Sequence, residues 1–486
     1  MRTMADIAAL LHQHLPTMQM SFEGDPEYDR ARATWNVRTQ FRPLGIVRPR
    51  STAEVATVMR CAREAGVTQI AIRSGGHSIE GNGLGGRGGH ALVIDLIHLD
   101  KITVDPKART ATVEPGALLG NLYWEAWSHG ELMVPGGDCL PVGVGGQATC
   151  GGYGRSVRRY GILTDHVMQV EVVTADGRVL IADDDTNSDL FWALRGSGTG
   201  SFAVITKFVL RLHEAPQAPA NFSLRYRLSD IDFVETFTAL QDFTLKAPTS
   251  FSPMLVIWQG ILEMVGVILT DTPDERDAVI AEMRATLPRP TESDIEPMSY
   301  IDVVATQAAT QTSAHWLAEP GKLSREADEN LRYQSIKAAH LPEPFTSEVI
   351  AKLGELAARQ PLQGARMQMQ ALDPASGLPA DATAVKVRGS VWLLGFGTDV
   401  ESDETDDPAS LVELGGARRW WPTEAYELMY PYTVGGYIGD DDLEEQLHGR
   451  DMYASYYGDH FPRLQAIKRK YDPDNLFHNA MSIPLD

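Results

Sequence analysis

One loop of this sequence combines small residues with a single imidazole. It consists of Arg73, Ser74, Gly75, Gly76, His77 and Ser78. The loop directly follows segment 67–73, whose pattern is typical of a strand. Because glycine and serine let the backbone approach a ligand, consecutive N–H groups here can form a nest that binds an anion such as a pyrophosphate. An ordinary glycine-rich turn would account for the same residues, since short glycine patterns are common.

A second glycine-rich segment, residues 135–154, carries a thiol in its first half. It reads PGGDCLPVGVGGQATCGGYG, and Cys139 supplies the thiol. This density of glycine is unfavourable for a helix or a central strand. Val142 and Val144 alternate with glycine, which is unlike a flexible linker. We therefore expect a backbone that follows the face of a planar ligand.

A third glycine segment, residues 195–202, reads RGSGTGSF and lies between a short helical pattern and a strand pattern. Each of the three loops stands at the end of a strand or helix. Together they indicate one extended ligand that lies between backbone segments.

Four motifs occur in one order along the chain: RSGGHS, GGDCLPVGVGG with GGYGRSVRRYG, RGSGTGSFAVIT, and a terminal YDPDNLF with SIP. In order and separation they resemble the berberine bridge enzyme-like branch of the vanillyl-alcohol oxidase superfamily. The resemblance runs from about residue 40 to 212 and from about 430 to the end, and the middle is weakly matched. It implies a PCMH-type FAD-binding fold and an FAD-linked oxidase.

The resemblance implies a flavin held by two covalent bonds. In such enzymes a histidine is bonded to the flavin 8α-methyl group and a cysteine to C6, and His77 and Cys139 occupy these places. Val142 occupies the place of a valine that admits O2 beside flavin C4a. A turn histidine and a free loop thiol are the alternative interpretations. Besides residues 73–78, the predicted FAD contacts are Cys139, Val142, Gly143, Gly145, Gly146, Gln147, Gly151, Gly152, Tyr153, Gly154, Gly200, Val204 and Asn475.

Two positions depart from the family pattern. Gln147 stands where many members have a histidine, and an amide cannot bring a full charge to the reduced flavin. Cys150 replaces the first glycine of the usual GGGxG, and we expect it to be a small packing residue.

The expected reaction removes a hydride from a C–H bond beside oxygen or nitrogen while a base takes the hydroxyl proton. Similar oligosaccharide oxidases use a tyrosine near the start of the C-terminal segment. Tyr437 occupies that aromatic place, although Gly436 replaces the usual asparagine. Tyr432 and Tyr430 are alternatives, and a core tyrosine is an equal interpretation for each of them.

Strand 365–372 is the second source of catalytic candidates. Plant alkaloid-forming relatives carry a catalytic glutamate on the corresponding strand, whereas this one offers Gln368 and Gln370 and no carboxylate. We therefore place Gln370 with Tyr437 and Tyr432 in the predicted catalytic site.

The substrate is predicted from few residues. Arg366 and Arg388 could contact an acidic substrate, and Trp392, Trp420 and Trp421 could line a sugar or aromatic pocket, with ion pairs and core packing as the default interpretations. We predict a small alcohol or hemiacetal, on a saccharide or a secondary metabolite, oxidised with O2 to give H2O2. A dehydrogenase with another electron acceptor and a non-catalytic flavin-binding protein are the alternatives.

Hydrophobic periodicity places the elements around these loops. Ser51 and Glu54 have capping-box spacing ahead of a helix that ends at Gly66. A hairpin turns at Asp176-Gly177, which is a favoured two-residue turn. The further expected elements are the hairpin 102–116, the helices 188–196, 273–286, 346–359 and 443–470, and the strands 91–96, 202–213, 221–227, 254–258, 261–269 and 365–372.

The chain is too long for one compact core, so two domains are expected in its 486 residues. We divide it into an FAD-binding domain at 1–215, a substrate domain at 216–434, and a segment 435–486 that returns to the first domain. The substrate domain reads as an antiparallel sheet covered by helices, which makes the fold class α+β.

Composition limits the partners. The net charge of −22 argues against nucleic acid and anionic membranes, which need a basic face. The N-terminal segment lacks the apolar core of a secretory signal, so we predict a cytoplasmic protein. Three cysteines without C-x-x-C spacing suggest neither a disulfide framework nor a metal site. The expected partners are a small substrate and O2, and the sequence leaves a homodimer open.

Overall fold

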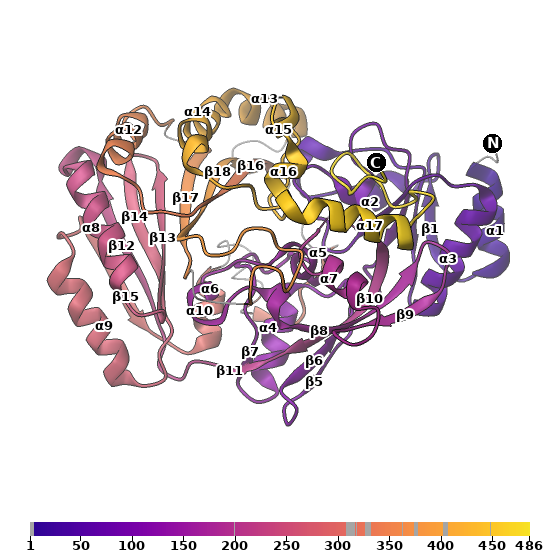
Figure 1. Cartoon of the computed structure of the whole chain (residues 1–486), viewed down its shortest axis with the longest axis horizontal. Helices are drawn as coiled ribbons and strands as arrows, with labels where there is room; N and C mark the ends of the chain where they lie inside the picture. Colours follow the sequence, from indigo (N-terminus) through magenta and orange to yellow (C-terminus); the bar gives the residue numbers. More distant parts are fainter. Residues whose placement is uncertain are drawn as a thin grey trace.

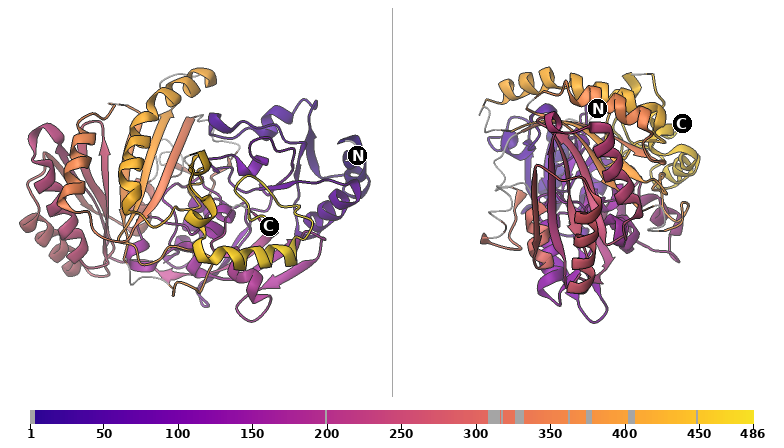
Figure 2. Two further views of the ribbon diagram at one scale, coloured as in Figure 1. Left: turned by 45° about the horizontal axis from the view of Figure 1, so that its top comes forward. Right: turned by 90° about the vertical axis from the view of Figure 1, so that its left-hand side faces the viewer.

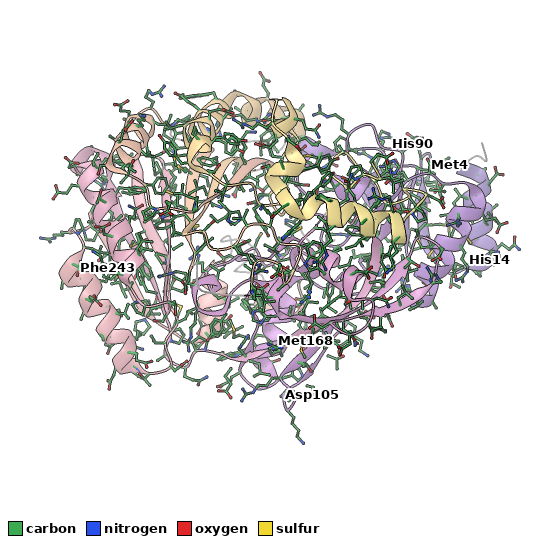
Figure 3. The ribbon with its side chains drawn as sticks, viewed as in Figure 1. Met4, His14, His90, Asp105, Met168 and Phe243 are labelled. Atoms are coloured by element: carbon green, nitrogen blue, oxygen red, sulfur yellow. The ribbon has the colours of Figure 1, made fainter. Side chains whose placement is uncertain are left out.

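The computed structural model describes residues 4–198, 200–307, 316, 318–325, 332–361, 363–373, 378–401, 407–447 and 449–486. A large antiparallel sheet lies at one end of the molecule and two smaller sheets lie at the other (Figure 1). The left-hand view of Figure 2 shows the same separation from a further direction. In Figure 3, Phe243 lies at the end with the large sheet, and Met4 and His14 lie at the opposite end.

The first small sheet positions the first glycine loop. Its strands, in order, are β1 (Gln19–Phe22), β2 (Gly45–Arg48), β4 (Leu92–Asp95) and β3 (Ile70–Arg73). Strand β4 runs parallel to both β2 and β3, so Arg73 and Asp95 meet at one edge of the sheet. Helix α3 (Thr52–Ala65) begins at the predicted Ser51 cap and ends at Gly66, and α1 (Met4–His14) packs beside it.

A second, five-stranded sheet contains both predicted hairpins. Its antiparallel strands, in order, are β5 (Ile102–Asp105), β6 (Thr110–Val113), β10 (Ala203–Arg211), β8 (Val167–Thr174) and β9 (Val179–Ala182). Helix α7 (Ser188–Leu194) lies between β9 and β10, as predicted. The third glycine loop therefore connects α7 to the central strand of this sheet.

The large sheet forms the second half of the site. Its strands, in order, are β15 (Glu292–Pro297), β12 (Ala220–Arg227), β14 (Ile261–Ile268), β13 (Phe251–Trp258), β17 (Ala365–Ala371), β18 (Trp392–Glu401) and β16 (Arg332–Leu341). All neighbours are antiparallel. The helices α8 (Phe233–Lys246), α9 (Pro273–Thr286), α12 (Ser347–Ala357) and α14 (Trp420–Met429) share one core with it. The α+β prediction is confirmed.

Strand β17 shows how this sheet uses its two faces. Met367 and Met369 are fully buried in the core under the helices. Gln368 and Gln370 alternate with them and face a cavity instead.

Two predictions of local structure were wrong. Residues 144–150 form the short helix α5 (Val144–Cys150) despite their glycine content. Its inner side chains Val144 and Ala148 are at most 1% exposed, and their packing outweighs the low helix propensity of glycine.

The predicted helix 443–470 is three helices. These are α15 (Glu444–Leu447), α16 (Met452–Tyr456) and α17 (Phe461–Tyr471). Asp451 caps α16 by accepting from the N–H of Ala454, and Pro462 lies in the first turn of α17. Caps and breakers of this kind interrupt a continuous apolar pattern.

The C-terminal segment packs on the small sheets, where α17 crosses them in Figure 1. The N–H of Ile70 donates to the carbonyl of Leu476 at 2.8 Å, and the buried Lys468 donates to the carbonyl of Ser201 at 2.8 Å. The boundaries predicted at 215/216 and 434/435 stay predictions. Within the described residues, no helix has the length and apolar character that crossing a bilayer requires.

Candidate active site

A cavity of about 660 Å3 lies between the glycine loops and the open face of the large sheet. This volume is within the usual range for cofactor and ligand pockets. One wall consists of the three loops, and the other presents side chains of β16, β17 and β18. The arrangement brings together segments that are far apart in sequence, such as Ser78 and Asp441, which are separated by 363 positions.

Most predicted cofactor contacts line this cavity. They are Arg73, Ser74, Gly75, Gly76, His77, Ser78, Cys139, Val142, Gly143, Gly145, Gly146, Gln147, Tyr153, Gly154 and Gly200. Four others lie outside the lining. In sequence, Gly151 and Gly152 lie between two residues that do line the cavity. Val204 is buried in the core, and Asn475 lies in the C-terminal segment.

The first two glycine loops touch each other. A Cβ atom on Gly75 would overlap the backbone nitrogen of Gly143, and one on Gly143 would overlap the hydroxyl of Ser74. The Ser74 hydroxyl itself donates to the carbonyl of Pro115 at 2.5 Å. Glycine is required here because two backbones meet at van der Waals distance.

Positive charge gathers beneath the first loop. The carboxylate of Asp95 pairs with Arg73 at 2.7 Å, with Arg48 at 3.2 Å and with Arg325 at 2.6 Å. Burial opposes ionisation of Asp95, but Arg325 and Arg73 hold its pKa well below the usual value. Burial lowers the pKa of Arg73 to about 10, so its guanidinium stays charged at neutral pH. Three cations on one anion leave an excess of positive charge that fits a pyrophosphate.

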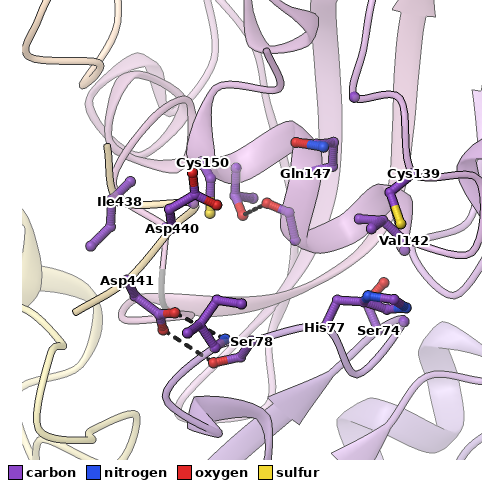
Figure 4. Close-up of a pocket in the computed structure, with 18 of the residues that line it drawn as sticks. Ser74, His77, Ser78, Cys139, Val142, Gln147, Cys150, Ile438, Asp440 and Asp441 are labelled. Atoms are coloured by element: carbon purple, nitrogen blue, oxygen red, sulfur yellow. Dashed lines mark hydrogen bonds between the residues drawn. The ribbon is translucent and has the colours of Figure 1, made fainter. Parts of the chain in front are cut away.

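An imidazole and a thiol lie at one end of the cavity. His77 stacks on Trp35 with ring centroids 5.0 Å apart. Burial, with Arg332 and Arg325 nearby, lowers the pKa of His77 to about 3, so the imidazole is uncharged at neutral pH. Cys139 is exposed to the same space, and Figure 4 shows the two side chains facing it from opposite loops.

Two tyrosines lie side by side in the cavity. Tyr437 and Tyr153 pack edge to face with centroids 4.9 Å apart. The Tyr437 hydroxyl accepts from the N–H of Gly152 at 3.2 Å and lies 3.5 Å from the amide oxygen of Gln147. Burial raises the pKa of both tyrosines, so both keep their protons at neutral pH. Tyr432 is 39% exposed and lies outside the lining.

The sheet wall is polar. Arg366, Gln368 and Gln370 line it from β17, and the amide nitrogen of Gln370 donates to the carbonyl of Ala371 at 3.2 Å. Arg388 instead forms a two-bond pair with Asp165.

The three tryptophans considered for the substrate pocket lie elsewhere. Trp392 and Trp421 are fully buried in the core, whereas Trp420 is 46% exposed. Cys150 is only half-buried and lines the cavity, whereas Cys61 is buried in helix α3.

Sequence reasoning missed several residues at the site. Trp35 and Arg325 reach it from distant segments, and no local pattern marks them. Asp440 and Asp441 follow Tyr437 closely, and this acidic run beside a candidate catalytic tyrosine was a usable signal. Among the described residues, no group of three or more histidine, cysteine or acidic side chains could hold a metal ion.

Comparison with known proteins agrees with this geometry. Residues 43–183 match the family described as "FAD binding domain", and residues 437–484 match "Berberine and berberine like". Glucooligosaccharide oxidase from Sarocladium strictum is 27% identical over 489 residues, which cover 95% of this chain and 91% of that protein.

Solved structures show the same fold over nearly the whole chain. Physcomitrella patens BBE-like 1 is 25% identical, with a TM-score of 0.84 and 99% of each chain covered. A glucooligosaccharide oxidase from Acremonium strictum, described with a "6-s-cysteinyl, 8 alpha-N1-histidyl FAD", is 25% identical, with a TM-score of 0.81 and 99% of each chain covered.

The cavity suits FAD, because touching glycine loops, excess arginine charge and a neutral imidazole line one continuous space. The family matches cover the first two glycine loops and most of the C-terminal segment. The chain therefore carries an FAD-binding domain and a berberine-like C-terminal domain, and over nearly its whole length it is similar to berberine bridge enzyme-like FAD-linked oxidoreductases.

Proposed function

We propose that this enzyme is an oxidase for an alcohol or hemiacetal group on a saccharide or a hydroxylated secondary metabolite, and that O2 is reduced to H2O2. One observation carries the proposal: a single cavity has dinucleotide-binding loops on one wall and hydrogen-bonding side chains on the other. When bound, FAD supplies the acceptor for two electrons. The similarity to glucooligosaccharide oxidase supports a hydroxylated substrate.

The proposal includes covalent attachment through His77 and Cys139. His77 is neutral and stacked, which leaves a ring nitrogen able to attack carbon, and Cys139 presents an accessible thiol. The related glucooligosaccharide oxidase, described with both linkages, supports the same pair here. Two bonds to neighbouring loops would fix the ring relative to the sheet wall.

The chain's own groups then have separate tasks. The arginines around Asp95 and the N–H groups of loop 74–77 bind the anionic part of the cofactor. Gln368 and Gln370 orient substrate hydroxyls, and Tyr437 and Tyr153 close the space between the loops and the sheet. We propose that Val142 lies where O2 approaches the ring.

Two measurements test this function. Protein precipitated with acid should keep its yellow colour, and mass spectrometry should find flavin mass on the peptides that contain His77 and Cys139. Anaerobic protein mixed with glucose, cellobiose or chitobiose should lose its visible flavin absorbance, and air should restore it with one H2O2 per substrate. Colourless protein after incubation with FAD would contradict the proposal.

A further inference from the structure

Two neighbouring aspartates, Asp440 and Asp441, have opposite surroundings. The Asp441 carboxylate accepts from the hydroxyl of Ser78 at 3.1 Å, the N–H of Ile79 at 3.0 Å, the N–H of Glu80 at 3.3 Å and the amide of Asn82 at 2.5 Å. A carboxylate has about four acceptor sites, so none remains for a ligand. Asp441 holds the C-terminal segment against the loop that carries His77.

Asp440 makes no such bonds. Its backbone N–H donates to the carbonyl of Tyr437 at 3.1 Å, which fixes the direction of the side chain. Among the described residues, no donor is bonded to its carboxylate, and the residue lines the cavity. In Figure 4, Asp440 and Asp441 extend from the same segment in different directions.

The groups around Asp440 define its electrostatics. Arg366 faces it from β17, Tyr437 and Asp441 flank it in its own segment, and Cys150 and Tyr153 lie beyond Tyr437. Burial raises the pKa of Asp440 to about 6, and Arg366 acts in the opposite direction. The carboxylate is therefore ionised at neutral pH and is a stronger base than an ordinary surface aspartate.

Other polar groups of the cavity fit this task less well. Tyr437 and Tyr153 have raised pKa values, and the Tyr437 hydroxyl is already engaged with Gly152 and Gln147. The amides of Gln368 and Gln370 cannot take a proton at neutral pH. On β18, Asp399 accepts from Gln334 at 3.2 Å, which occupies it in the sheet.

We propose that Asp440 is the catalytic base of the proposed oxidase, accepting the hydroxyl proton of the substrate. As the O–H bond breaks, the C–O bond becomes a carbonyl and the hydrogen on the same carbon leaves with its two electrons to FAD. Asp440 then carries the proton as a carboxylic acid. O2 takes up the two electrons, the transferred hydrogen and one proton, which gives H2O2 and restores the carboxylate.

The first test uses sulfite, which adds to the flavin ring and needs no knowledge of the substrate. In the wild type, sulfite should bind more tightly as the pH falls through 6, because protonation removes a negative charge near the ring. Asp440→Asn should bind sulfite several-fold more tightly at pH 8 and lose that transition. Asp440→Glu should retain the transition and serves as the matched control.

The second test measures flavin reduction by whichever of glucose, cellobiose or chitobiose reduces the wild type without oxygen. Asp440→Asn should slow reduction about 10²- to 10⁴-fold, as expected for loss of a general base, with a smaller change in KM. Asp440→Glu should recover part of the rate, and Tyr437→Phe should lose less than Asp440→Asn.

The outcomes separate this inference from the oxidase proposal. If no sugar reduces the wild type, the sulfite titration alone decides the role of Asp440. The inference is overturned if sulfite affinity in Asp440→Asn changes with pH as it does in the wild type. It is also overturned if flavin in this variant is reduced at a rate within tenfold of the wild type. Wild-type protein that contains no bound flavin would instead contradict the proposed function.

Discussion

The two walls of the cavity are built on different principles. The loop wall is mostly backbone: Gly75 and Gly143 let two chains touch, and N–H groups face the cofactor. The sheet wall is mostly side chains, with Arg366, Gln368 and Gln370 projecting from one strand. A backbone wall suits a ligand that never changes, whereas a side-chain wall can be altered one residue at a time to suit a different substrate.

Breaking the loop wall should have the largest effect. In Gly75→Ala, the added Cβ would overlap the backbone of Gly143, which cannot move as a side chain can. We expect the purified variant to retain almost no flavin and to lose about 1–3 kcal/mol of unfolding free energy. Absorbance at 450 nm and thermal unfolding measure both. Gly416→Ala, where nothing lies within 4 Å, is the control and should keep its flavin.

A bulkier residue at the ring should affect oxygen alone. Val142→Leu adds volume where we propose that O2 approaches the flavin. Reoxidation of the reduced enzyme in air-saturated buffer should slow about tenfold, which corresponds to about 1.4 kcal/mol. Anaerobic reduction by substrate should stay near the wild-type rate. Equal slowing of both half-reactions would show that the valine has no specific role toward oxygen.

Altering the sheet wall should change substrate use and leave the cofactor in place. Gln368→Leu removes an amide that faces the cavity. Loss of one neutral hydrogen bond of about 1 kcal/mol should lower kcat/KM about fivefold, while the flavin content stays unchanged. Gln363→Leu, an exposed neighbour, is the matched control. A fall in flavin content would mean that the two walls do not act independently.

The smallest expected effect concerns pH. Arg366 opposes the burial that raises the pKa of Asp440 to about 6. Oxidation requires the ionised carboxylate, so the rate should rise with pH through this pKa. Arg366→Gln should move the midpoint to higher pH, by roughly one unit or less, because water screens a half-exposed guanidinium. The pH profile of flavin reduction measures this shift, and a midpoint that moves to lower pH contradicts the assignment.

The same contrast explains what the sequence could predict. The loop wall lies in contiguous motifs, so the family resemblance that these motifs carry could assign His77, Cys139 and Gln147 to one cavity, and all three line it. Both hairpins and helix α3 followed from local patterns as well. Helix α5 was missed because the packing of Val144 and Ala148, which local propensity does not include, determines it.

The sheet wall could not be assembled in this way. Its residues come from strands that are far apart in sequence. The alternation of apolar and polar side chains on β17 identifies the polar face of the strand, but it does not show which segment lies across the cavity from that face. Trp35 reaches His77 because Asn36 bonds to the backbone of Gln334, a contact across 298 positions. Tyr432 matched the expected type and position, yet only the three-dimensional fold shows that it points to solvent.

The contacts of the last segment with the first and third glycine loops have a consequence for synthesis of the chain. The carbonyl of Leu476 accepts from the N–H of Ile70 in the strand before the first loop, and Asp441 accepts from the N–H of Ile79 after that loop. Lys468 donates to the carbonyl of Ser201 in the third loop. A ribosome finishes the three glycine loops, which end at residue 202, long before it reaches Lys468 and Leu476. We therefore expect the binding site to be complete only after the final helix has emerged. A chain truncated near residue 460 should keep the three glycine loops, lose the contacts of Lys468 and Leu476, and retain no flavin.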